Sequence, residues 1–364
     1  MTTAIKVVLF EDTDQIRLEI LNALKQCLLP DGVALLFGSD QFTENSADQG
    51  KMYEDRLEKI LSNQLFSDTT LIVADGDLSK STDSHFGGLS VNAVAAAAKR
   101  LAIPVCSYSR QPELADYELR GRGAEGQIVL RFSDSQELAR TASLAARGFA
   151  AITVGLPEAI ADKSKNNSVA KILAVLLGKP DFSEKIALYS VGDQSRLSEI
   201  IANPNLNSLQ VRTMSHFLGY WLWDSLLRYP GLFVNKIAAA SYLNIDTSDF
   251  GQLAVRSLFD EALYKGPFAD SVNPQWWRGM LDDIVSRENC ADGLQLAQNK
   301  LSKVLHGCKC CVDPTMQAGY YCIISRAPVS FENSKGGLSW FPRGADLTRI
   351  SNPKYEEYGP WLGV

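Results

Sequence analysis

Apolar and polar residues alternate along the first 150 residues in short blocks. Apolar runs of four to six residues are typical of buried strands, and apolar spacings of three and four are typical of amphipathic helices. The expected strands are residues 5–10, 33–37, 70–74, 103–109 and 126–132, and the expected helices are residues 14–28, 50–65, 90–101 and 133–148. Strands that alternate with helices form a parallel sheet with helices on both faces. The pattern therefore predicts an α/β domain with a doubly wound, five-stranded parallel sheet.

The pattern changes after residue 150. Residues 150–157 suggest a further strand, and residues 168–178 a short helix that Gly178 and Pro180 end. We expect four regions: an α/β domain (1–150), connecting elements (151–207), a mostly helical region (208–305) and a small Cys-rich C-terminal lobe (306–364).

Length and charge narrow the class of protein. A chain of 364 residues is long enough for two or three domains. The net charge of −6 argues against broad binding to nucleic acid or anionic membranes. We find no apolar stretch of the roughly 18 residues that a membrane-spanning helix needs, and no signal peptide. We therefore expect a soluble cytoplasmic protein with no membrane partner.

Acidic residues stand where two of the predicted strands end. Glu11 and Asp12 follow the first strand, and Asp75 follows the third, in "LIVADGDLSKS". Ligands of such folds bind beyond the carboxyl ends of the strands, so these three carboxylates are expected to converge. Carboxylate oxygens suit Mg²⁺, and the Asp75 carboxylate beside that ion can attack a phosphoryl donor.

The first domain resembles the receiver domain of two-component response regulators. The matching stretches, within about residues 4–147, are "VVLFED", "LIVAD", "GLSVNAVAAAAKRLAIPVCSYS" and "GAEGQIVLRFSDSQEL". The resemblance implies a flavodoxin-like sheet, Mg²⁺ bound by Glu11 and Asp12, and phosphorylation of Asp75. It also implies that the hydroxyl of Ser109, after the fourth strand, senses the phosphate.

The chain departs from that family after the fifth strand. The family has a lysine followed by a proline there, whereas this chain has Leu130 and Arg131. Arg131 can take the lysine's place, since guanidinium is a good partner for phosphate. The departure equally fits a receiver that no longer signals by phosphorylation, and Asp75, Gly76 and Asp77 can simply begin a turn.

Cysteines gather in "HGCKCCVDPTMQAGYYC". Cys308 and Cys311 have the C-x-x-C spacing of a zinc knuckle, and Cys322, Cys290 or His306 can complete a tetrahedral Zn²⁺ site. Buried thiols in a compact lobe are the alternative. A nucleophilic cysteine paired with His306 is a third interpretation.

We expect a regulatory protein in which the receiver-like domain, phosphorylated or not, controls a C-terminal output through protein–protein contacts. A partner kinase or regulatory protein is implied, and the aromatic segment 217–231 offers a surface for a homodimer. One alternative is a receiver-gated enzyme with its site in residues 190–364. Another is a DNA-binding helix-turn-helix near 235–265, although Arg256 is the only cation of its second helix.

Overall fold

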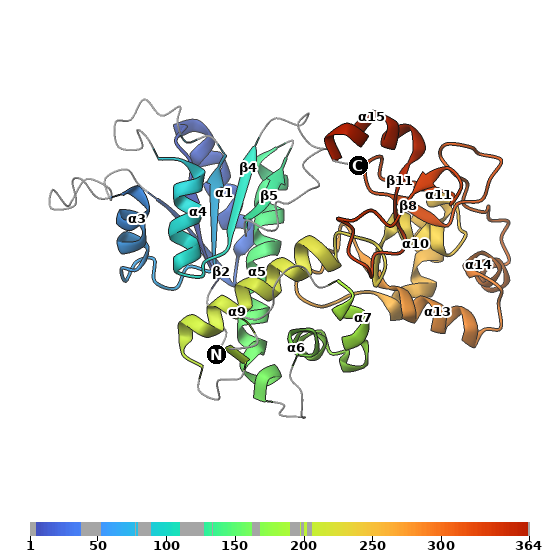
Figure 1. Ribbon diagram of the computed structural model, residues 1–364, viewed down its shortest axis with the longest axis horizontal. Coiled ribbons are helices and arrows are strands. Elements are labelled where there is room, and N and C mark those ends of the chain that lie inside the picture. The colour runs from blue at the N-terminus through green and yellow to red at the C-terminus, as the bar shows by residue number, and fades with distance from the viewer. Residues whose placement is uncertain are drawn as a thin grey trace. The chain divides into compact units, whose positions relative to one another are not determined.

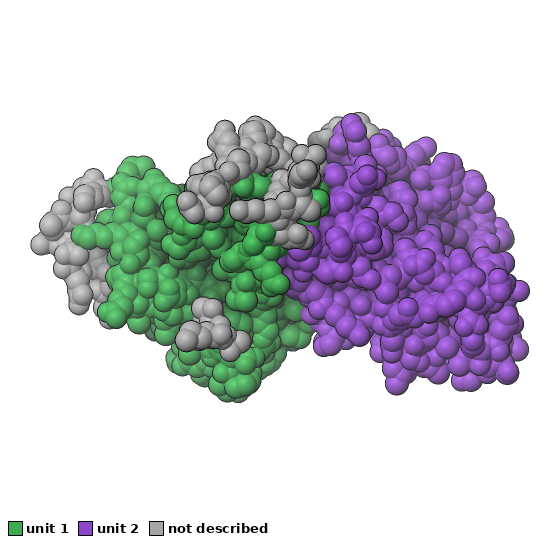
Figure 2. All heavy atoms as spheres, turned by 90° about the horizontal axis from the view of Figure 1, so that it is seen from below, with its two compact units in different colours: residues 1–172, 194–220 green, residues 173–193, 221–364 purple. Residues whose placement is uncertain are grey.

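The computed structural model describes residues 5–37, 52–76, 78, 89–109, 127–132, 134–161, 168–189, 197, 200–201 and 206–362. They belong to two compact units (Figure 2). The first comprises residues 1–172 and 194–220, and the second residues 173–193 and 221–364. Helices α6 (Val169–Leu176) and α9 (Ser208–Trp221) carry the chain across this division.

The first unit is built on a five-stranded parallel sheet (Figure 1). Its strands are β1 (Ile5–Phe10), β2 (Gly32–Leu36), β3 (Leu71–Asp75), β4 (Val105–Ser109) and β5 (Gln127–Arg131). Their order is β2-β1-β3-β4-β5, and every neighbouring pair is parallel. This is the predicted doubly wound, flavodoxin-like arrangement. All five carboxyl ends consequently lie along one edge of the sheet.

Helices cover the sheet because alternate strand residues point to opposite faces. The described helices of the sheet domain are α1 (Asp14–Leu28), α3 (Tyr53–Leu61), α4 (Val91–Arg100) and α5 (Ser135–Ala161). Val8, Phe10, Ile72 and Ala74 form one core cluster with residues of α3 and α4. Helix α1 packs against α5, which also contacts β1, β3 and β5.

Helix α5 corrects one expectation. The segment 150–157, expected as a strand because of Ile152, Thr153 and Val154, is part of this helix. Its buried residues Phe149, Ile152, Leu156 and Ala159 recur at helical spacing, which outweighs the strand preference of a β-branched run. By length and composition α5 would also suffice to cross a membrane, which corrects the expectation that the chain has no apolar stretch of that length. Its buried face packs against α1 and the sheet, as in the core helix of a soluble protein.

The second unit is helical at first and ends in a cysteine-containing part, as predicted, and this part contains a small sheet that was not predicted. Its helices are α7 (Ser183–Ala187), α10 (Lys236–Tyr242), α11 (Thr247–Gly251), α12 (Leu253–Arg256), α13 (Arg278–Arg287), α14 (Gly293–Leu301) and α15 (Asn352–Leu362). Strands β6 (Phe233–Asn235) and β7 (Gln275–Trp277) pair with each other. A four-stranded sheet has the order β10-β11-β8-β9. Its strands are β8 (Tyr320–Cys322), β9 (Ala327–Val329), β10 (Ser334–Lys335) and β11 (Thr348–Ser351).

The segment proposed as a helix-turn-helix consists of short helical pieces. Asp246 caps α11 by accepting from the amide of Ser248. Helix α11 has only five residues, and Gln252 then takes an extended conformation before α12 begins. Residues 247–256 therefore do not form one continuous helix that could lie in a major groove.

Candidate functional site

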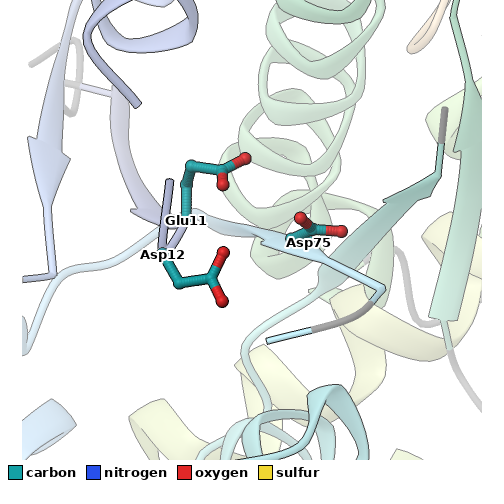
Figure 3. Close-up of side chains that lie close together, drawn as sticks. All are labelled: Glu11, Asp12 and Asp75. Atoms are coloured by element: carbon teal, nitrogen blue, oxygen red, sulfur yellow. The ribbon is translucent and has the colours of Figure 1, made fainter. Parts of the chain in front are cut away.

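Three carboxyl groups meet at the carboxyl edge of the five-stranded sheet. Glu11 and Asp12 directly follow β1, and Asp75 is the last residue of the neighbouring strand β3. One ligand oxygen from each lies within 4.8 Å of the others. Figure 3 shows the three carboxyl groups arranged around a common space. The strand order therefore produces the acidic cluster that the strand-end positions predicted.

Glu11 is held by two hydrogen bonds in a fully buried position. Its Oε1 accepts from the amide of Thr13 at 2.9 Å, and its Oε2 accepts from the hydroxyl of Tyr108 at 2.5 Å. Tyr108 lies on β4, so its side chain reaches Glu11 across the end of β3, the strand between them. A buried carboxyl group needs such donors, because burying it without partners is costly. The two bonds fix its orientation within the acidic cluster.

Asp12 supplies the observation that fits a cation. Its Oδ1 accepts from the hydroxyl of Thr13 at 3.3 Å, whereas its Oδ2 is buried and has no hydrogen-bond partner among the described residues. A buried oxygen without a donor calls for an unseen water or ion. A cation would also offset the repulsion among three adjacent carboxylates. The donor set is all oxygen, which is the set that Mg²⁺ prefers, so these residues fit that ion.

Ser109 and Arg131 end the next two strands at the same edge. Ser109 is the last residue of β4 and Arg131 the last of β5, and the two are paired in register. Their side chains, and Asp77 as a whole, lie outside the described residues. Leu130, next to Arg131, is buried in β5. The backbone thus puts Ser109 and Arg131 at the right edge, and their contacts stay a prediction.

Tyr108 is the site residue that sequence reasoning missed. In the strand 103–109 it has the position of an ordinary buried residue. The signal that could have found it is a phenol next to the strand end, in register with Asp75. Buried tyrosine hydroxyls usually find a polar partner, and at this edge the available partners are the carboxylates.

Three of the residues predicted to bind zinc, Cys322, Cys290 and His306, each contact different hydrogen-bond partners. Cys322 Sγ accepts from the amides of Ser351 and Ser325 at 3.2 and 3.4 Å. Cys290 Sγ donates to the Glu288 carbonyl at 3.5 Å, and exposed His306 has Nδ1 3.2 Å from Asp249 Oδ2. Among the described residues, only Glu11, Asp12 and Asp75 bring three such ligand atoms together. Zinc at the cysteines stays a prediction that this geometry does not favour.

The remaining thiols differ in their environments. Burial raises the pKa of Cys308 to about 12. Burial also acts to raise the pKa of Cys310, but amide donors from Asp313, Ser330 and Val312 outweigh it, and the net pKa is lowered. Cys311 is exposed, and its pKa is raised by partial desolvation and by the neighbouring thiols. Hydrogen bonds to sulfur, rather than a paired base, account for the pKa of Cys310.

Comparisons with protein-family models, with curated proteins and with solved structures found no match to this chain.

Proposed function

We propose that the first unit is a receiver-type phosphoacceptor domain in which Asp75 accepts a phosphoryl group. The observation that carries the proposal is the cluster of Glu11, Asp12 and Asp75 at the carboxyl edge of a flavodoxin-like sheet. Ligand sites of doubly wound sheets lie at this edge. The resemblance to receiver domains assigns the same roles to the same three residues.

The chemistry is a phosphoryl transfer to a carboxylate. An Asp75 oxygen forms a bond to phosphorus, and the donor's leaving group departs with the electron pair of the bond that breaks. Glu11, Asp12 and Asp75 would hold Mg²⁺, which when bound neutralises negative charge on the phosphoryl group. Tyr108 and the amide of Thr13 keep Glu11 oriented toward the cluster.

Ser109 and Arg131 have the strand-end positions to contact the phosphorylated residue. We assign the Ser109 hydroxyl as a hydrogen-bond donor to a phosphate oxygen. We assign the Arg131 guanidinium as the cation that replaces the family's lysine, since its planar fork suits phosphate geometry.

The second unit is the proposed output, acting through contacts with another protein in the cytoplasm. A partner kinase or a second copy of the chain is the kind of partner that this role implies. The short helices α11 and α12, with Arg256 as their only cation, favour a protein partner over DNA.

The test is labelling of the full chain with a small phosphodonor. Incubation with phosphoramidate and Mg²⁺ should add one phosphoryl group to the intact protein, as measured by mass spectrometry, and chelation of Mg²⁺ should prevent it. Asp75→Asn should abolish the added mass. The matched control is Asp31→Asn, an exposed aspartate just before β2 at the opposite edge of the sheet, which should label like wild type. Unlabelled wild-type protein would instead support a receiver that works without phosphorylation.

A further inference from the structure

A hollow of about 170 Å³ lies at the amino-terminal ends of the strands of the same sheet, away from the acidic cluster at their carboxyl ends. Residues 68–70, which lead into β3, and residues 102 and 104, which lead into β4, form one side of it. Residues of α5 and α9 form the other side. All of these residues belong to the first unit. The proposed phosphoacceptor site uses none of them.

Arg212 gives the hollow a fixed positive charge. Its Nη1 donates to the Ser67 carbonyl at 3.1 Å and its Nη2 to the Thr69 carbonyl at 3.3 Å. These bonds hold the guanidinium in place through neutral acceptors and use two of its five N–H groups. Burial lowers the pKa of Arg212, and the Asp68 carboxylate, which also lines the hollow, acts in the opposite direction. Within the described part of the chain, no carboxylate pairs with this guanidinium.

The rest of the wall is largely apolar. Ala102 and Pro104 line it from the sheet side, and Phe149, Ala150 and Val154 line it from α5. The hydroxyl groups of Thr153 and Ser215 donate to the carbonyls of their own helices. A ligand therefore meets the Arg212 cation, the Asp68 carboxylate and the His216 ring in a wall that is otherwise mostly apolar. The volume is below the roughly 300 Å³ of sites for drug-sized molecules, which restricts the occupant to a small one.

Two contacts make the hollow rigid. The Tyr220 hydroxyl on α9 donates to the Val105 carbonyl and accepts from the Val105 amide, both at 3.0 Å. Gly219 packs so closely on Phe149 that an added Cβ would lie 2.2 Å from its ring. Helix α9 is thereby fastened to the start of β4 and to α5. A site that is already formed loses little free energy to ordering when a ligand binds.

We propose that this hollow, the Arg212 pocket, binds a small monocarboxylate with a compact apolar body. The carboxylate would accept from the free N–H groups of Arg212, whose fork geometry matches two carboxylate oxygens. The apolar body would cover Phe149, Ala150 and Pro104. A phosphate dianion fits less well, because its second charge and further oxygens would face apolar walls.

The experiment is a titration of the full chain with benzoate and 4-methylpentanoate, followed by saturation-transfer difference NMR. The neutral amides of both acids serve as matched ligands. We expect saturable binding of at least one carboxylate, and binding of its amide weaker by roughly tenfold or more. Arg212→Gln should weaken the carboxylate by a similar factor. Ala150→Leu should also weaken carboxylate binding, because the larger side chain fills the hollow while the guanidinium is unchanged.

Ala151→Leu is the control for the second variant. Ala151 is the exposed neighbour of Ala150 on α5 and does not line the hollow, so its enlargement should leave binding unchanged. Three results would each overturn the proposal: no saturable binding of either acid up to high millimolar concentration, equal binding of acid and amide, or unchanged binding to folded Ala150→Leu protein.

Discussion

Two residues of the acidic cluster, Glu11 and Asp12, differ in how the protein satisfies their carboxyl oxygens. Glu11 is a buried carboxyl group whose two oxygens accept hydrogen bonds from the Thr13 amide and the Tyr108 hydroxyl. Asp12 has a buried oxygen that no described residue satisfies. The first carboxyl group is therefore fixed by the protein, and the second is open to an ion.

Tyr108→Phe removes one of the two donors to Glu11 without changing the packing volume. A buried acceptor left without its donor costs about 1–3 kcal/mol of stability. All six tryptophans, at position 221 or later, belong to the second unit, so tryptophan fluorescence would not follow this change. We expect faster amide hydrogen exchange in β1 and β4, measured by mass spectrometry. The control Tyr355→Phe, in the second unit, should leave these strands unchanged, and unaltered exchange in Tyr108→Phe would contradict the assigned role.

The acidic cluster was predictable from sequence, whereas Tyr108 and the Arg212 pocket were not. Strand ends and a doubly wound order suffice to bring Glu11, Asp12 and Asp75 together. Tyr108 reaches Glu11 across the end of the intervening strand β3. The alternation of buried and exposed residues along a strand does not show which residue of another strand a side chain will contact. The Arg212 pocket joins residues from 68 to 216. No local sequence motif indicates a site whose residues come from four separate segments of the chain.

The packing of helix α9 against helix α5 depends on a small residue, Gly219, at their contact. Gly219→Ala should gain about 1 kcal/mol in helix propensity. The new methyl group would nevertheless collide with the Phe149 ring, and such overpacking typically costs about 1–3 kcal/mol. We expect net destabilisation, seen as faster hydrogen exchange in α5 and α9. Gly359→Ala in α15 is the matched control, since its Cβ would meet no atom of the described residues within 4 Å. Slower exchange in Gly219→Ala would contradict the close packing.

Helix α5 contains the segment 150–157, which was wrongly predicted to be a strand. The run of Ile152, Thr153 and Val154 has strand propensity, but it continues a helix that begins at Ser135. Tertiary packing of Phe149, Ile152 and Leu156 decides the conformation there. The five strands of the sheet were predictable, because each is a short apolar run with polar boundaries.

The cysteine segment yields a test by alkylation. The thiolate is the reactive form, so exposed Cys311, whose pKa is raised, should react with iodoacetamide before Cys308 and Cys322, and increasingly as pH rises. Because its pKa is raised, half-maximal reactivity should fall at higher pH than for an unperturbed thiol of pKa about 8.5. Peptide mapping of the native protein measures this order. Equal protection of Cys308 and Cys311, lost on adding a chelator, would instead support the zinc site.

For the whole molecule, the function we propose gives the two units different roles: the first unit accepts a phosphoryl group, and the second acts on another protein. Asp75 is the residue on which this division of labour depends. An acyl phosphate on Asp75 can be reduced by borohydride to homoserine, which marks its position in the chain permanently.

The decisive measurement is therefore peptide mass spectrometry of the full chain after treatment with phosphoramidate, Mg²⁺ and then borodeuteride. We expect deuterated homoserine at position 75, absent when Mg²⁺ is chelated. Homoserine at another aspartate, or its absence from wild-type protein that remains folded, would contradict a phosphoacceptor at the edge where Glu11, Asp12 and Asp75 meet.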